Sequence, residues 1–157
     1  MRLVVFADSH GNYAVLRRII QLQAAADGYI HLGDNVRDFT PIAESYPEKL
    51  TCSVRGNNDW DADVPLMNLL VLENKRVLFT HGHNFNVKRS NDLLLEEAKE
   101  RKADIVLYGH THMPYTGYVG GIYLLNPGSV SVPLDGRPTY GVVDITAAGV
   151  VTRVVEL

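Results

Sequence analysis

Five short clusters of histidine, aspartate and asparagine residues recur along the sequence, each directly after an apolar segment. They are Asp8-Ser9-His10, Gly33-Asp34-Asn35, Gly56-Asn57-Asn58-Asp59, His81-Gly82-His83 and Gly109-His110-Thr111-His112. Five of the six histidines fall in these clusters, which offer nitrogen and oxygen donors but no sulfur. Such a donor set suits Mn, Fe, Co, Ni or Zn, and poorly suits Ca or Mg, which prefer oxygen ligands. The residue types therefore indicate a transition-metal site.

The spacing within the clusters supports the same interpretation. Asp-x-His and His-x-His place two side chains on one side of a segment if that segment is extended. Glycines at 33, 56, 82 and 109 allow sharp turns and a close approach of the backbone to an ion. Each cluster alone also fits an ordinary turn, because Asp and Asn are common turn residues. Only the ordered set of five indicates metal binding.

The elements that position these clusters are apolar, β-rich runs. Strands are expected at residues 3–7, 29–32, 51–55, 76–80 and 104–108. Ligand sites of α/β folds gather at the carboxyl ends of strands, so the five clusters are expected to converge on one pocket. Helices are expected from Asn12 to about Ala26, with Gly28 as the stop signal, from Pro41 to Tyr46, and from about Asp92 to Lys102 with Ser90 or Asn91 as the cap.

The second half of the chain favours hairpins. Strand pairs are expected at 69–73 and 76–80 around Asn74-Lys75, at 115–119 and 122–125 around Gly120-Gly121, and at 139–145 and 149–156. Crossover units early and antiparallel strands later predict an α/β sandwich with two mixed β-sheets and few helices.

The ordered motif set resembles that of the calcineurin-like metallophosphoesterases over essentially the whole chain. The short length and the later Asn126-Pro127-Gly128-Ser129 resemble the small YfcE-type branch of phosphodiesterases in that superfamily. The resemblance implies a single domain over residues 1–157 with a four-layer αββα fold. It also implies a dinuclear metal centre at the carboxyl ends of the strands, with Mn as the first choice and Ni, Co, Fe or Zn as alternatives.

The resemblance also implies which residues bind each ion. The ligands of the first metal would be Asp8, His10, Asp34 and His112. The ligands of the second metal would be Asp34, Asn57, His81 and His110. Asp34 and a water or hydroxide would bridge the two ions, and the hydroxide would attack phosphorus in line without a covalent enzyme intermediate.

The chain departs from the larger family members at Asn58, where they carry a histidine that is a candidate proton donor. An amide cannot act as a general acid, although it can donate a hydrogen bond to a phosphate oxygen. We therefore assign Asn58 and Asn35 to substrate binding and His83 to the role of replacement acid or phosphate contact. Asp59 is the second catalytic candidate; alternatively it orients a ligand or caps a turn. Leaving-group protonation is then expected to be weak, which favours esters with acidic leaving groups.

Three further residues have structural interpretations. His31 lies in a predicted strand and points opposite to its neighbours, so it is interpreted as structural or supporting. Cys52 is interpreted as a small core residue. Trp60 could form a wall of the pocket or cover an apolar surface, and Lys88-Arg89 is interpreted as a solvated pair.

Composition narrows the function. The 157-residue chain has a net charge of −3, so no basic field attracts a nucleic-acid polymer or an anionic membrane. One cysteine, no apolar run of membrane-spanning length and no signal-peptide pattern favour a cytoplasmic protein. The expected substrate is a small phosphodiester. The alternatives are a phosphomonoesterase with the same centre and a non-catalytic scaffold, as in a eukaryotic retromer subunit that resembles this fold. The later strands could also support a homo-oligomer.

Overall fold

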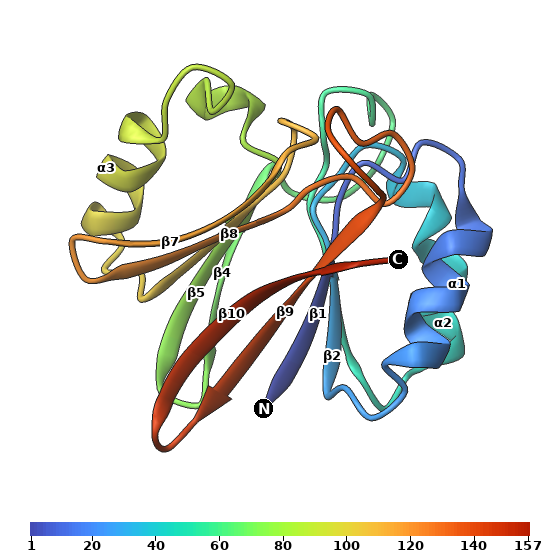
Figure 1. Cartoon of the computed structure of the whole chain (residues 1–157), viewed down its shortest axis with the longest axis horizontal. Helices are drawn as coiled ribbons and strands as arrows, with labels where there is room; N and C mark the ends of the chain where they lie inside the picture. The colour runs from blue at the N-terminus through green and yellow to red at the C-terminus, as the bar shows by residue number, and fades with distance from the viewer.

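The computed structural model describes residues 1–157 and contains two mixed, five-stranded β-sheets (Figure 1). The order of strands in the first sheet is β10 (Gly149–Glu156), β9 (Thr139–Thr146), β1 (Arg2–Phe6), β2 (Gly28–His31) and β3 (Leu50–Ser53). The order in the second sheet is β4 (Met67–Leu72), β5 (Lys75–Thr80), β6 (Ile105–Tyr108), β8 (Ile122–Pro127) and β7 (Pro114–Val119).

The elements form four layers, as predicted. Helices α1 (Tyr13–Leu22) and α2 (Thr40–Ser45) cover the outer face of the first sheet, and α3 (Asp92–Glu100) covers the outer face of the second (Figure 1). The two sheets pack face to face through a cluster of 14 buried residues contributed by both. Two short 3-10 helices, Val36–Asp38 and His83–Phe85, lie in the loops. None of the helices is long and apolar enough to cross a membrane.

Strand β1 illustrates why the central strands are continuously apolar. Leu3 and Val5 face the second sheet, whereas Val4 and Phe6 face the helices. All four side chains are fully buried. A parallel strand covered on both faces needs apolar residues at every position, not only at alternate ones.

Parallel pairing brings the predicted clusters to one end of the molecule. Strands β1, β2 and β3 are parallel to one another in the first sheet, and β5, β6 and β8 in the second. The loops that follow β1, β2, β3, β5 and β6 carry the five polar clusters. These loops meet at the top of the view in Figure 1.

Some predicted boundaries were wrong. Helix α1 ends at Leu22 instead of Ala26, and Gly28 begins β2 instead of stopping the helix. The chain has to leave the helix early because Gly28 pairs with Leu3 and the Asp27 backbone N–H donates to the Arg2 carbonyl.

The other shifts have local causes. Helix α3 ends at Glu100 because Lys102 adopts a left-handed conformation with φ +53°. The turn of the β4–β5 hairpin lies one residue earlier than predicted, at Glu73-Asn74, and both turn residues have positive φ. Such a turn matches the right-handed twist of the flanking strands.

Candidate metal centre

Four of the predicted ligands converge at the top of the sandwich. Asp8, His10, Asp34 and His112 each place a donor atom within 4.8 Å of those of the other three. His112 Nε2 lies 3.1 Å from Asp8 Oδ1 and 3.4 Å from His10 Nε2. These residues come from the loops after β1, β2 and β6, so both sheets contribute to the group.

A second group of predicted ligands adjoins the first through Asp34. His81 Nε2 lies 3.5 Å from Asp34 Oδ1 and 3.2 Å from His110 Nδ1. The other oxygen, Asp34 Oδ2, lies 4.0 Å from His10 Nε2. Asp34 therefore presents one oxygen to each group. Asn57 belongs to the loop after β3, and its Oδ1 is buried without a hydrogen-bond partner.

The charges of the site fit a divalent cation. Asp8 and Asp34 are buried carboxylates, and neither forms an ion pair with a lysine or arginine. Asp8 Oδ1 also lacks a hydrogen-bond partner. A buried carboxylate without a cationic partner is costly, so this arrangement suits a cation among the oxygen and nitrogen donors.

Two histidines are oriented for metal binding by backbone carbonyl groups. His81 Nδ1 lies 2.7 Å from the Leu32 carbonyl oxygen, and His112 Nδ1 lies 2.7 Å from that of Val132. A carbonyl only accepts, so each Nδ1 carries the proton and donates it. The lone pair of Nε2 is left facing the carboxylates, as in metal-bound histidines.

The protonation states of most donor groups in the site also suit metal binding. Burial lowers the pKa of His110 to about 4, and the neighbouring His81 and Lys88 add to the effect. Although burial opposes it, His81 and two hydrogen bonds from Asn58 lower the pKa of Asp34. Both groups are thus deprotonated at neutral pH, as metal binding requires. His112 is the exception, because the adjacent Asp8 carboxylate raises its pKa.

The backbone at the site differs from the extended segments that we predicted. Asp8, His10, Asp34, His110 and His112 all have positive φ, between 45° and 68°. Each such residue costs about 1–3 kcal/mol, and conformations of this kind concentrate at functional sites. The i and i+2 ligands of Asp-Ser-His and His-Thr-His therefore converge through paired left-handed residues, not through strand alternation.

Gly56 shows how closely the loops are packed. A Cβ at this position would lie 2.1 Å from Asp34 Oδ1 and 2.6 Å from the Asp34 backbone nitrogen. Only glycine leaves room for the carboxylate. At this position the predicted glycine beside a ligand is required because any side chain would clash with Asp34.

Asp59 holds the Asp34 loop through backbone hydrogen bonds. Its Oδ2 accepts from the N–H groups of Asp34 and Gly56 at 2.8 Å, and its Oδ1 accepts from those of Asn35 and Val36 at 2.9 Å. All four donors belong to the backbone, so the buried carboxylate faces the loop. These contacts favour the interpretations in which Asp59 orients a ligand or caps a turn over the one in which it is catalytic.

The two asparagines predicted to bind substrate differ in their surroundings. Asn58 is exposed, and its side-chain amide donates to Asp34 Oδ2 at 2.7 Å while its backbone N–H donates to Oδ1 at 3.0 Å. Asn35 is half-buried in a left-handed conformation, and its side chain makes no hydrogen bond. The structure thus places Asn58 directly on the site and Asn35 beside it.

His83 lies next to the second group of ligands. Its ring centroid is 5.4 Å from that of His81 and 6.1 Å from that of His110. Its Nδ1 is buried without a hydrogen-bond partner. Together with Asn57, Arg55 and Trp60 it lines a cavity of about 300 Å³. Trp60 is 88% exposed there, which favours its interpretation as a pocket wall.

Several supporting residues were not predicted. Ser9 Oγ donates to Asp38 Oδ2 at 2.7 Å and lies 3.0 Å from His31 Nε2. His31 Nδ1 accepts from the Gly33 N–H, so the structural interpretation of His31 is confirmed. Ser129 Oγ donates to the Asp8 carbonyl at 2.8 Å.

Asn126 supports the other sheet's loop, because its side-chain amide donates to the Gly109 carbonyl. Ser129 and Asn126 belong to the Asn-Pro-Gly-Ser segment, which in the sequence serves only as a family marker. That segment was the available signal for both residues.

Comparisons with known proteins match the chain to one family. The sequence model of the family described as "Calcineurin-like phosphoesterase superfamily domain" matches residues 1–148. Phosphodiesterase YfcE of Escherichia coli K12 is 32% identical, with 92% of this chain and 88% of that protein covered.

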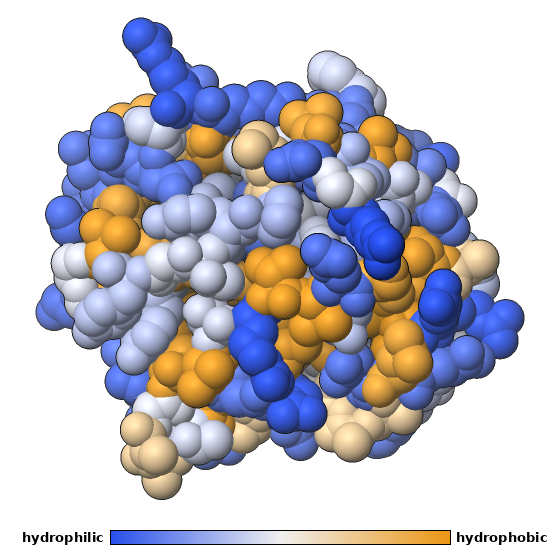
Figure 2. Space-filling model, in the orientation of Figure 1, coloured by the Kyte–Doolittle hydropathy of each residue, from blue (hydrophilic) through white to orange (hydrophobic).

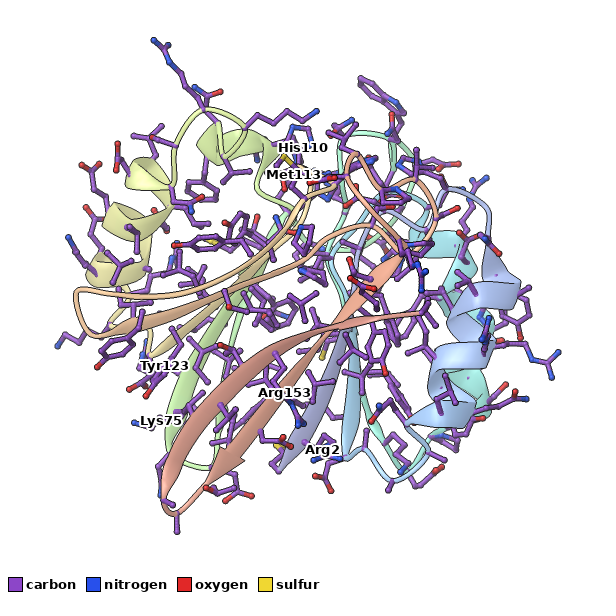
Figure 3. The ribbon with its side chains drawn as sticks, viewed as in Figure 1. Arg2, Lys75, His110, Met113, Tyr123 and Arg153 are labelled. Carbon is purple, nitrogen blue, oxygen red and sulfur yellow. The ribbon has the colours of Figure 1, made fainter.

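Solved structures of other proteins share the fold of this chain. A predicted phosphoesterase from Streptococcus pneumoniae has a TM-score of 0.85 at 28% identity and covers 99% of this chain and 88% of that one. Vps29 of Entamoeba histolytica, in a complex with zinc, shares the fold with a TM-score of 0.75 at 20% identity, covering 99% of both chains. Figure 3 shows His110 at the point where the loops of the two sheets meet.

Replacing Asp59 tests its positioning role. Asp59→Asn turns one acceptor oxygen into an NH₂ group that faces two backbone N–H donors, which should destabilise the metal-free protein by roughly 2 kcal/mol or more. Urea denaturation in EDTA measures this. Asp61→Asn is the matched control, since Asp61 is an exposed acid of the same loop that pairs with Arg37. Equal stability of the two variants would contradict the positioning role.

His31 should make the stability of the metal-free protein depend on pH. Burial lowers the pKa of His31 to about 4 from 6.5, so the unfolded state binds more protons between these values. Stability contributed by the neutral ring is complete above pH 6.5 and is lost as the pH falls towards 4. When the pH is lowered from 7 to 5 in EDTA, the free energy of unfolding of His31→Gln should therefore fall by about 2 kcal/mol less than that of the wild type. Equal losses in the two proteins would refute this.

Proposed function

The chain belongs to the calcineurin-like phosphoesterase superfamily, and on that premise we propose that it is a dinuclear phosphodiesterase that hydrolyses small phosphodiesters. Membership makes the chain a metal-dependent phosphoesterase. The number of ions, their identity and the preference for diesters are the proposal.

The position of Asp34 is the observation that carries the proposal. Its two oxygens face different groups of nitrogen donors, with His10 on one side and His81 on the other. A carboxylate in this position is suited to bridge two cations. Asp8, His10 and His112 would complete the ligands of one ion, and Asn57, His81 and His110 those of the other.

Two divalent ions, when bound, would lower the pKa of a water between them and offset the charge that develops on the phosphoryl oxygens. The nitrogen and oxygen donors suit Mn as the first choice, with Ni, Co, Fe or Zn as alternatives. The protein's own contribution is to hold these donors in place. The backbone carbonyls of Leu32 and Val132 fix the ring orientation of two of the histidines, His81 and His112.

The proposed reaction is an in-line displacement at phosphorus. The oxygen of a deprotonated water forms a bond to phosphorus while the bond from phosphorus to the leaving oxygen breaks. The leaving oxygen then takes up a proton, so the products are a phosphomonoester and an alcohol. Asn58, whose amide donates to Asp34, would donate a hydrogen bond to a phosphoryl oxygen, with Asn35 as the second substrate-binding residue.

His83 is the proposed proton donor. Burial lowers its pKa, and the neighbouring His81 adds to the effect, so the protonated ring is a minor form at neutral pH. Leaving-group protonation would accordingly be weak. This supports a preference for esters whose leaving groups are acidic.

The size and charge of the chain support a small substrate. The core elements use most of the 157 residues, and the net charge of −3 does not favour a nucleic-acid polymer. YfcE of Escherichia coli is named a phosphodiesterase, which favours diesters over monoesters. The proposed compartment is the cytoplasm, and exposed apolar residues on the outer strands, such as Tyr118 and Val151, could support a homo-oligomer.

A scaffold function is the second candidate, because Vps29 of Entamoeba histolytica shares the fold. Here, however, all seven predicted ligands are present, and six of them lie in two adjoining groups. The full set of predicted ligands favours the phosphoesterase over the scaffold.

Removal of the bridging carboxylate tests the dinuclear centre. In Asp34→Asn the bound metal should fall below the two ions per chain expected of the wild type, and cleavage of bis(p-nitrophenyl) phosphate should fall by roughly 100-fold or more. Elemental analysis and an assay with added Mn measure these values, with Asp61→Asn as the control. If Asp34→Asn kept two ions and full activity, the bridging role would be wrong. Faster release of p-nitrophenol from the monoester than from the diester would instead favour a phosphomonoesterase.

A leaving-group series tests His83. We expect kcat/KM of the wild type to fall as the pKa of the leaving phenol rises. His83→Ala should lower cleavage further for phenol, by about 10- to 100-fold, and much less for p-nitrophenol. Asn84→Ala, at an exposed neighbouring position, is the control. A uniform loss across the series would assign His83 to phosphate contact, and a flat dependence in the wild type would refute weak protonation.

A further inference from the structure

A second cavity opens beside the candidate metal centre and has no part in the mechanism above. Its volume is about 510 Å³, a size typical of sites for small organic ligands. It shares no lining residue with the cavity that contains His83 and Trp60. Its lining includes Met113, Tyr115 and Leu134 as walls and Tyr108 as part of the interior.

The cavity is lined by residues that are chain neighbours of the candidate ligands. Thr111, one of its lining residues, lies between the candidate ligands His110 and His112. Met113 directly follows His112, and the Leu134 N–H donates to the His112 carbonyl. Figure 3 shows Met113 next to His110 at the top of the molecule. A group attached to a phosphorus atom at the centre could therefore extend directly into the cavity.

The walls favour a flat, apolar group. Met113, Tyr115 and Leu134 are exposed although they are large and apolar, with 51%, 42% and 68% of their surface accessible. Apolar side chains appear along the upper edge of the molecule, where the loops of the two sheets meet (Figure 2). Tyr and Met side chains suit contact with an aromatic ring, through ring packing and sulfur–ring contacts. Tyr108 is fixed by a hydrogen bond from Asn91, which gives the interior a polar edge.

The mouth of the cavity carries a positive charge. Lys88 lines it, is exposed and forms no ion pair with any acidic residue. A cation in the lining of this cavity complements a ligand with an anionic phosphoryl group at one end and an apolar group at the other.

We propose that this cavity is a subsite for the retained substituent of the phosphodiester, and that it selects an aromatic group there. The inference rests on the proposed function. The leaving group would then occupy the cavity that contains His83, the proposed proton donor, so the two arms of a diester would have separate places. Tyr115 and Leu134 are specificity-determining residues in this scheme.

The first test measures binding without turnover. The chain has three methionines, Met1, Met67 and Met113, so methyl-labelled methionine gives few NMR signals, two of which serve as internal references. In the zinc-loaded protein, phenylphosphonate should shift the Met113 signal strongly, and methylphosphonate should shift it little. Met1 and Met67 should stay in place with both ligands. Equal shifts of Met113 with the two phosphonates, or no shift with phenylphosphonate, would overturn the proposal.

The second test measures specificity with one leaving group. Phenyl p-nitrophenyl phosphate and methyl p-nitrophenyl phosphate both release p-nitrophenol and differ only in the retained arm. We expect kcat/KM of the wild type to favour the phenyl diester by about tenfold. The double variant Tyr115→Ala/Leu134→Ala should lose most of this preference, because it removes two apolar walls of the cavity.

Matched controls and the two readouts separate the possible failures. Tyr118→Ala/Leu22→Ala removes an exposed tyrosine of the same strand and an exposed leucine outside the cavity, and it should keep the wild-type preference. Unchanged Met1 and Met67 signals verify the fold of each variant. A phenyl preference that survives Tyr115→Ala/Leu134→Ala would overturn the subsite. If no protein cleaves either diester with any metal, the proposed function fails, and the phosphonate shifts still decide whether the cavity binds the aromatic group.

Discussion

Two buried carboxylates without a basic partner, Asp8 and Asp34, are the constraint on which the rest of the structure depends. Both lie among histidine rings, with no lysine or arginine within ion-pairing distance. In the absence of a cation, such groups oppose folding through their lost hydration and mutual repulsion. The hydrogen bonds and histidine rings around Asp8 and Asp34 hold these two carboxylates in place and surround them with further donor atoms for a cation.

Hydrogen bonds between the two sheets hold the site together against this destabilisation. The His81 ring from the second sheet binds the Leu32 carbonyl of the first, and the His110 N–H donates to Asp8 Oδ2. Ser129 supports Asp8 from the loop after β8. Left-handed backbone conformations at five ligand positions are unfavourable, and packing of the large core between the sheets offsets their cost. A rigid, strained frame of this kind keeps donor atoms near an ion's geometry before the ion arrives, which is what makes a metal site selective and strong.

The surroundings of the centre fit a substrate with two arms better than a polymer. Two separate cavities adjoin it, one with Asn57, His83 and Trp60, and the other with Thr111, Tyr115 and Leu134. Lys88 supplies a local positive charge in a chain whose net charge is negative. Attraction for a phosphoryl anion would therefore come from the centre and its surroundings, because the net charge of the whole chain is negative.

The α/β class, the central strands and the types of the candidate ligands could be predicted from the sequence alone. These features follow from local patterns, since apolar runs specify strands and ligand chemistry depends on residue type. In contrast, the early end of α1, the left-handed backbone at Asp8 and His110, and the contacts of Asp59 and Ser129 depend on residues that are distant in the chain. The backbone N–H groups that donate to the Asp59 carboxylate lie 23 to 25 residues away in the chain, apart from that of Gly56. Ser129 and Asp8 are 121 residues apart. Contacts of this range arise only when separate strands and their loops come together in the folded chain, so no local pattern specifies them.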